Sequence, residues 1–170
     1  AAAIVERVRS YAKGTRSERV SSEVSELVNK AVREFKRQSG ERVEVWVLQE
    51  HPVYIIVNPL EFELVIINLL RNAAQALQEL GVLNPKVALT IKREDNKALI
   101  AIEDNGHIEK EKIEKLSEPT NSTKADGLGL GLQIVRSIIE NHGGKIFFSQ
   151  AASGGLRVEI RLPAEETTEQ

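Results

Sequence analysis

The sequence predicts a two-layer α+β sandwich, in which helices cover one face of a sheet. Two long segments, at about 22–38 and 58–81, have the apolar spacing of amphipathic helices. Shorter runs are typical of strands, because their apolar residues alternate or are dense. Turns join these strands, which are grouped separately from the helices. A chain of 170 residues with 41% hydrophobic content is sufficient for one domain with a sizeable core.

The chain divides into three parts. Residues 1–20 are expected to form a charged, amphipathic helical lead that Gly14 interrupts. The globular domain is expected to span residues 21–164. Residues 165–170 are polar and terminal, and they are expected to be a disordered tail.

The first half of the domain is expected to begin with a helix that Ser22 and Glu23 open and Gly40 ends. Strands follow at 42–48 and 53–57, and in the first of them Val43, Val45 and Val47 alternate with polar neighbours and Trp46. The rest of the expected elements are a helix over 58–81, a hairpin of strands 86–93 and 98–103 turned at 94–97, a short charged helix over 110–116, a mobile loop to Leu128, a helix from about Gly131 to Gly143, and strands 145–149 and 155–162.

The helix over 58–81 is marked at both ends. Asn58 can cap it, Pro59 suits the first helical position, Glu61 lies three residues after the cap and Gly81 ends it. Its expected apolar stripe consists of Leu60, Leu64, Ile67, Leu70, Ala74 and Leu77.

The opposite side of this helix carries amides. Asn68, Asn72, Gln75 and Glu79 recur at helical spacing and are expected on one face. A solvated face is an equally good explanation for Gln75 and Glu79. Two asparagines inside a helix are less ordinary, because each costs roughly 0.5 kcal/mol relative to alanine. Amide oxygens one turn apart suit a Mg²⁺–phosphate complex, since Mg²⁺ prefers oxygen ligands and keeps several waters.

Three glycines, Gly127, Gly129 and Gly131, lead into the amphipathic helix that ends at Gly143. Glycines let backbone N–H groups approach an anion, and a helix N-terminus leaves its first N–H groups unpaired. This pattern indicates a phosphate-binding turn. Taken alone the signal is weak, because it matches neither the P-loop nor the dinucleotide fingerprint, and a flexible linker before a helix would look the same.

The strand over 98–103 runs into Asp104, Asn105 and Gly106. A carboxylate can accept hydrogen bonds from the exocyclic amine of a base. Gly106 is expected to adopt a left-handed backbone that lets a flat ring approach. Asp-Asn-Gly is also a common turn sequence, so taken alone it favours a simple turn over a base-binding site.

In order and spacing, the segments N-L-L-R-N-A-A-Q-A-L, D-N-G, S-T-K, G-L-G-L-G-L-Q-I-V and H-G-G resemble the nucleotide-binding boxes of sensor histidine kinases. That superfamily also includes DNA gyrase, the heat-shock chaperone ATPases and the mismatch-repair ATPases. The resemblance covers about Leu27 to Pro163. The N-L-L-R-N-A-A-Q-A-L segment is most similar to that of kinases of nitrogen regulation and dicarboxylate sensing. It implies a Bergerat-type fold, with a mixed, mainly antiparallel sheet covered on one face by helices.

The resemblance also implies a set of site residues and the cofactors ATP and Mg²⁺. Asn72 would be the metal ligand, Asp104 would accept from the adenine amine, and Asn68 and Lys124 would act at the terminal phosphates. The nucleotide-binding residues it implies are Asn68, Asn72, Gln75, Asp104, Gly106, Ile108, Thr123, Lys124, Gly127, Gly129, Leu130, Gly131 and Leu132.

This chain departs from the family pattern in three places. Relatives usually read D-N-G-x-G-I, whereas His107 and Ile108 follow Gly106 here. They carry an aromatic F-E-P-F-F box where this chain reads S-E-P-T-N from Ser117, and a threonine is common where Leu156 stands. Without aromatic anchors the loop after Ser117 is expected to be loosely held.

The function that the resemblance implies is transfer of the ATP γ-phosphate to a histidine on a separate dimerisation domain, for relay to a response regulator. Residues 1–20 look like the end of that domain's helical hairpin, and the full-length protein is expected to be a homodimer. Two alternatives stay open: an ATPase of the same superfamily and a nucleotide-binding module without catalysis. In the ATPases a glutamate base occupies the position of Asn68, and an amide cannot accept a proton.

Composition limits other functions. A net charge of -2 with dispersed basic residues argues against nucleic acid as a partner. The absence of cysteine excludes a disulfide framework, and no apolar run approaches membrane-spanning length. The domain is therefore expected in the cytoplasm, with any anchor in the inner membrane belonging to a longer parent. None of His51, His107 and His142 lies in an acceptor pattern; His142 is interpreted as a helix C-terminal residue that the helix dipole favours.

Overall fold

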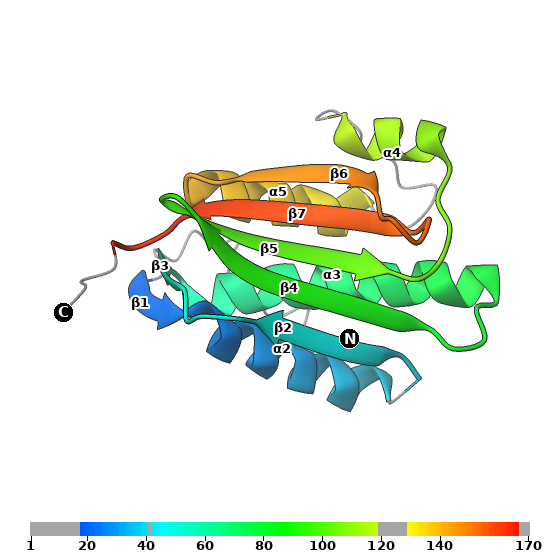
Figure 1. The fold of residues 1–170 in the computed structure, drawn as a ribbon, viewed down its shortest axis with the longest axis horizontal. Helices are drawn as coiled ribbons and strands as arrows, with labels where there is room; N and C mark the ends of the chain where they lie inside the picture. Colours follow the sequence, from blue (N-terminus) through cyan, green and yellow to red (C-terminus); the bar gives the residue numbers. More distant parts are fainter. Residues whose placement is uncertain (1–17, 41, 119–128, 167–170) are drawn as a thin grey trace.

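The computed structural model describes residues 18–40, 42–118 and 129–166 (Figure 1). Thr123, Lys124 and Gly127 lie outside the described residues, as do most of the expected lead and the loop to Leu128. The side chain of Leu130 is likewise outside the described part.

The elements follow the predicted order, with one addition at the N-terminus. They are β1 (Val20–Glu23), α2 (Val24–Ser39), β2 (Glu44–Gln49), β3 (Tyr54–Val57), α3 (Pro59–Leu80), β4 (Lys86–Glu94), β5 (Lys97–Asp104), α4 (Lys110–Ser117), α5 (Gly129–Asn141), β6 (Lys145–Gln150) and β7 (Leu156–Pro163).

The main sheet has the order β2-β4-β5-β7-β6. Strand β2 runs parallel to β4, and the other neighbours are antiparallel. Helices α3 and α5 lie behind this sheet in Figure 1, and α2 packs on α3 and β2. This arrangement confirms the predicted two-layer α+β sandwich with a mixed, mainly antiparallel sheet.

The N-terminal boundary differs from the prediction. Residues 18–20 are not helical: Val20 begins β1, which pairs antiparallel with β3 in a separate two-stranded sheet. Glu23 ends this strand and caps α2, because its carboxylate accepts from the Glu26 N–H at 2.8 Å. A four-residue strand with one apolar residue has no periodicity of its own, so its pairing with β3 decides its conformation.

Helix α3 is the centre of the core, and it is buried on more sides than the predicted stripe. Its caps are as predicted: Asn58 Oδ1 accepts from the Glu61 N–H at 2.8 Å, and Gly81 is left-handed. Leu60, however, is 60% exposed, whereas Phe62, Val65 and Ile66 are buried. The reason is that α3 packs against α2, α5 and the sheet at once.

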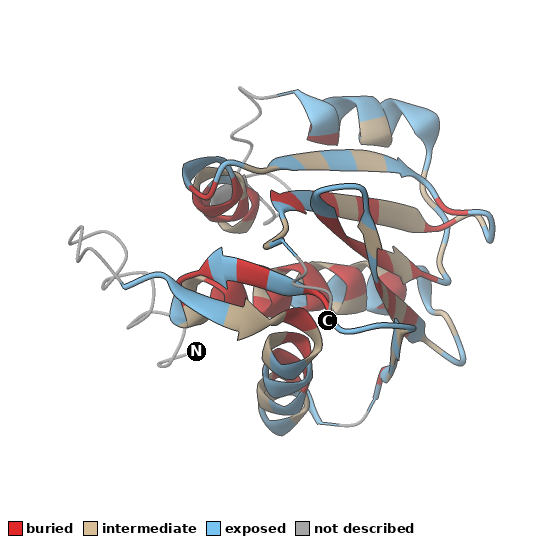
Figure 2. Ribbon diagram, turned by 60° about the vertical axis from the view of Figure 1, so that its left-hand side comes forward, coloured by how far each residue is buried: buried red, intermediate tan, exposed pale blue. Residues whose placement is uncertain are grey.

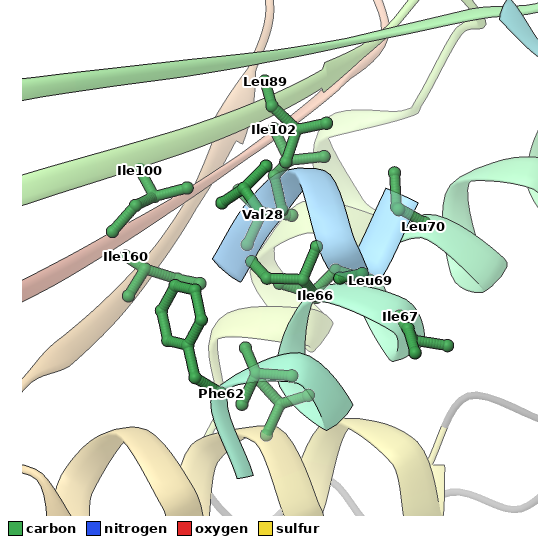
Figure 3. Close-up of a cluster of buried hydrophobic side chains, with 14 of the residues drawn as sticks. Val28, Phe62, Ile66, Ile67, Leu69, Leu70, Leu89, Ile100, Ile102 and Ile160 are labelled. Atoms are coloured by element: carbon green, nitrogen blue, oxygen red, sulfur yellow. The ribbon is translucent and has the colours of Figure 1, made fainter. Parts of the chain in front are cut away.

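Figure 3 shows how these side chains meet: Phe62, Ile66, Leu69 and Leu70 of α3 face Leu89, Ile100, Ile102 and Ile160 of the sheet, and Val28 of α2 joins them. Figure 2 shows the same relation over the whole molecule, with buried residues on the facing sides of helices and sheet. Each fully buried side chain of this size contributes about 1.5–3 kcal/mol. The core therefore holds α3, with its asparagines, at a fixed distance from the sheet.

His142 ties the end of α5 to the start of α3. It is buried, its Nδ1 donates to the Ile138 carbonyl at 2.8 Å, and its Nε2 accepts from the Asn58 N–H at 3.2 Å. Because a backbone N–H can only donate, the ring is the neutral tautomer with the proton on Nδ1. His142 directly follows the C-terminal end of α5, as interpreted from the sequence, and the structure adds that it is a hydrogen-bonded link to α3.

Candidate nucleotide-binding site

A cavity of about 310 Å³ lies between α3, α4, α5 and the helix-facing side of the sheet. Its floor is one row of side chains across adjacent strands: Ile102 on β5 pairs with Val158 on β7, which pairs with Phe148 on β6. Paired residues point to the same face of a sheet, so these three form a continuous apolar surface. Leu69 of α3 and Leu132 of α5 close the sides. The volume and the apolar lining suit a flat ring.

Asp104 supplies a buried carboxylate to this cavity. It is 7% exposed and ends β5. Burial raises the pKa of Asp104, and hydrogen bonds from the backbone N–H groups of Gly106 and Leu156 oppose that rise. The Gly106 N–H lies 2.9 Å from Oδ1. A buried acceptor beside an apolar floor can pair with an N–H donor on a bound ring.

Gly106 and Gly155 allow close approach to this carboxylate. The backbone of Gly106 is not left-handed, which corrects the prediction. A Cβ there would instead lie 2.9 Å from Leu77 Cδ2 and 3.2 Å from Asp104 Oδ1. At Gly155 a Cβ would lie 2.2 Å from the Asp104 carbonyl oxygen. Sequence reasoning missed Gly155, although the adjacent glycines at 154 and 155 were the available signal.

The asparagines of α3 lie on the side of the cavity toward α5. Asn72 lines the cavity directly. Asn68 is half-buried, its Nδ2 donates to the Leu64 carbonyl at 3.0 Å, and its Oδ1 lies 3.4 Å from where a Cβ on Gly131 would be. The asparagine face of α3 and the glycine start of α5 are therefore brought together.

Gln75 lies elsewhere. It is exposed, donates to Glu79 Oε1 at 3.2 Å, and lines a second cavity of about 700 Å³ between the C-terminal ends of α2 and α3. With about 100° per residue, Gln75 is turned roughly 60° away from Asn72 around the helix axis. This rotation places Gln75 at the second cavity, while its partner Glu79 lines the first cavity together with Asn72.

Helix α5 begins at Gly129, two residues earlier than expected. Leu132 is buried in the cavity wall, and Ile108 lines the cavity while its N–H donates to the Gly154 carbonyl at 3.0 Å. His107 lies at the cavity with its Nε2 3.1 Å from Glu109 Oε1. The floor residues on β5, β6 and β7 were not singled out from the sequence, since alternating apolar positions in strands indicate only a buried face.

A bound Mg²⁺ would have few protein ligands here. Within residues 18–40, 42–118 and 129–166, no three His, Asp or Glu side chains are arranged to hold a metal ion. One amide oxygen, that of Asn72, is nevertheless compatible with Mg²⁺, which commonly takes one or two protein ligands and completes its shell with phosphates and water. The donor set therefore fits a metal that arrives with a nucleotide.

Residues 57–166 match the family of histidine kinase-, DNA gyrase B- and HSP90-like ATPases. The chain belongs to this family. The matched residues include those that line the cavity, both asparagines and the glycine start of α5. The family resemblance found in the sequence is therefore confirmed. With it, ATP is confirmed as the nucleotide that this family binds.

The curated relatives of this chain include sensor proteins and sporulation kinases. The chain is 38% identical over 110 residues to the sensor protein TdiS of Thauera aromatica, covering 61% of this chain and 20% of the relative. It is 37% identical over 102 residues to sporulation kinase B of Bacillus subtilis, covering 59% of this chain and 23% of the relative. The chain thus spans about a fifth of the length of the curated relatives it matches.

Solved structures agree on the fold. The catalytic domain of the histidine kinase ThkA is 27% identical with a TM-score of 0.72, covering 86% of this chain and 95% of that one. The histidine kinase domain of the E. coli osmosensor EnvZ is 25% identical with a TM-score of 0.65, covering 92% and 96%. The Bergerat-type fold is confirmed. No helix among the described residues is long and apolar enough to cross a membrane.

Proposed function

We propose that this chain is the ATP-binding catalytic domain of a sensor histidine kinase, which transfers the γ-phosphate of ATP to a histidine on a separate dimerisation domain for relay to a response regulator. The observation that carries the proposal is the buried Asp104 carboxylate beside an apolar floor, in a cavity that also contains Asn72. Its family membership and its kinase relatives support the same assignment.

In this proposal different residues contact the base, the metal ion and the phosphates of the nucleotide. Asp104 accepts from the adenine amine, while Ile102, Val158 and Phe148 contact the ring. Asn72 holds Mg²⁺, which would neutralise phosphate charge as transfer proceeds. Asn68 and the first N–H groups of α5 approach the phosphates, because a helix N-terminus favours anions.

Other roles rest on the motifs alone. Lys124 would meet the terminal phosphates, and Thr123, Gly127, Gly129 and Leu130 would surround the phosphate chain. Gln75 would reach the phosphates only if its side chain turned away from Glu79. The residues before Val20 would lead back to the dimerisation domain, which would make the full-length protein a homodimer. The domain would work in the cytoplasm, with the parent anchored in the inner membrane.

The ATPase alternative is less well supported. Water activation in that class needs a base at the position of Asn68, and this amide already donates to the Leu64 carbonyl at 3.0 Å. An amide has no basic site at neutral pH. Slow or absent ATP hydrolysis by the isolated chain is therefore expected.

The test of the proposal is calorimetric titration of ATP with and without Mg²⁺, followed by phosphotransfer. The wild type should bind ATP more tightly with Mg²⁺, and Asn72→Ala should lose that difference while retaining metal-free binding. A supplied cognate hairpin domain should then acquire an acid-labile phosphohistidine from labelled ATP. Binding without transfer would support the non-catalytic alternative, and absence of any metal dependence in the wild type would exclude Asn72 as the ligand.

A further inference from the structure

Arg136 of α5 contacts two separate walls of the nucleotide cavity. Its guanidinium carbon lies 5.2 Å from the centre of the Phe148 ring on β6. Its Nη2 donates to the carbonyl oxygen of Leu116, near the C-terminal end of α4. Phe148 and Leu116 both line the cavity. One side chain on α5 therefore contacts α4 and β6 at the same time.

The location of each contact favours a cation. The C-terminal end of a helix carries partial negative charge, so a guanidinium at the last carbonyls of α4 is stabilised. The face of the Phe148 ring attracts the same cation. Burial lowers the pKa of Arg136, and the charge of Glu140 opposes this. The group stays protonated, since a guanidinium does not lose its proton in proteins.

The two contacts together require arginine. A planar guanidinium can stack on a ring through its face while an N–H in its plane donates to a carbonyl. A lysine ammonium can approach one partner, but it has no flat face with which to cover the other. The geometry at Arg136 thus uses a property that Lys does not share.

We propose that Arg136 is a positioning residue for nucleotide binding, which holds Leu116 of α4 and Phe148 of β6 at the spacing that the base requires. The proposal rests on the function proposed above, because it takes the 310 Å³ cavity as the nucleotide site. Arg136 itself is not a phosphate ligand in this proposal. Its effect reaches the nucleotide only through the two walls.

A neighbouring arginine provides a matched control. Arg161 lies 5.1 Å from the centre of the Phe147 ring, so the same type of contact occurs one residue away on β6. Successive residues of a strand point to opposite faces, and Phe147 is paired with Glu159 on the face away from the helices. Replacing Arg161 removes a cation from a ring, and an ion pair with Glu159 at 2.6 Å, without touching the cavity.

The experiment compares Arg136→Gln and Arg136→Lys with Arg161→Gln and Arg161→Lys. Affinities for Mg-ATP and for adenosine are measured by calorimetry and by NMR titration, and amide hydrogen exchange is measured over α4. Arg136→Gln should weaken both ligands by the same factor, about fivefold to tenfold, because part of the energy of one hydrogen bond and one cation–π contact within the protein is coupled to binding. Amides of Lys110–Ser117 should exchange faster by a similar factor. Arg136→Lys should fall between wild type and Gln, and both Arg161 variants should stay within about twofold of wild type.

Three results would overturn the proposal. Loss of ATP affinity with unchanged adenosine affinity would show that Arg136 contacts the phosphates directly. Unchanged exchange in α4 would show that Arg136 does not hold that helix. Equal losses in the Arg161 variants would show a general effect of β6 stability.

If Arg136→Gln does not fold, Arg136→Lys supplies the same comparisons. If the wild type binds neither ligand, the nucleotide function fails, while α4 exchange still tests the contact with Leu116.

Discussion

At the scale of single residues, Asp104 combines a functional position with an unfavourable environment. Its carboxylate is almost fully buried, and burial raises its pKa above the usual 3.8. A group with a raised pKa in the folded state contributes stability below its unfolded pKa, and loses it as pH rises through the folded value. Above its raised pKa the ionised Asp104 therefore destabilises the nucleotide-free fold. Such groups are common in functional sites.

Asp104→Asn should separate stability from binding. The variant should unfold at an equal or higher urea concentration than wild type at pH 7. This advantage should shrink as the pH falls through the raised pKa of Asp104, and it should be absent below the unfolded pKa of about 4. ATP affinity should fall at least tenfold, because a hydrogen bond to a charged acceptor contributes about 1.5–3 kcal/mol. Urea unfolding at several pH values and calorimetry measure the two effects. Reduced stability at pH 7 with intact ATP binding would contradict both parts.

Glycine is required at position 155 because a Cβ there would clash with Asp104, and not because of its backbone conformation. A Cβ at Gly155 would lie 2.2 Å from the Asp104 carbonyl oxygen, and backbone atoms cannot rotate away. Gly155→Ala should destabilise the fold by about 1–3 kcal/mol through overpacking. Gly131→Ala is the control, since its Cβ would meet Asn68 Oδ1 at 3.4 Å, an ordinary contact. Thermal unfolding should show a clear decrease for Gly155→Ala alone, and similar melting temperatures for both variants would rule out the contact at Gly155.

At the scale of elements, the relation between α3 and α5 determines the site, because α3 carries the asparagines and α5 begins at the glycines. His142 links the two helices at their far ends through the Ile138 carbonyl and the Asn58 N–H. The Asn58 N–H is buried, and Asn58 is also the cap of α3. The same short segment therefore starts α3 and receives the end of α5.

His142→Phe should fill the space but leave the Asn58 N–H without an acceptor. An unsatisfied buried donor costs about 1–3 kcal/mol, so the free energy of unfolding should fall by that amount. His51→Phe is the control, because His51 is exposed. Chemical denaturation measures both variants. A His142 variant as stable as wild type would show that the link is not needed to hold α5 on α3.

At the scale of the whole molecule, none of the histidines in the described residues suits a phosphoryl acceptor. His142 is buried and bonded at both ring nitrogens, and His51 is exposed in the connection between β2 and β3. His107 lies at the cavity and contacts Glu109. The function proposed for this domain therefore needs an acceptor on another domain.

Labelled Mg-ATP should leave the isolated chain without covalent phosphate. Adding a cognate hairpin domain should place an acid-labile phosphohistidine on that domain only, which gel autoradiography with acid and base treatment distinguishes. The control is His107→Ala, which should behave like wild type in transfer to the partner. Stable label on the chain alone that disappears in His107→Ala would reverse this expectation.

Local chemistry in the sequence determined the element order, the caps of α3 and the family. Asn58, Pro59 and Gly81 act through their own backbone neighbourhood, and the asparagine, Asp-Asn-Gly and glycine motifs keep their order along the chain. These features do not depend on distant partners. The family resemblance that these motifs carry is what assigned Asn68 and Gly131 to one expected nucleotide site.

The tertiary structure alone decided the features that depend on residues far apart in sequence. Pairing with β3 makes Val20–Glu23 a strand, and rotation about α3 directs Gln75 to another cavity. The contact of Gly155 with Asp104 and the two contacts of Arg136 join elements that no local pattern connects. Sequence periodicity reports which face of an element is buried, whereas only packing determines which partner covers it.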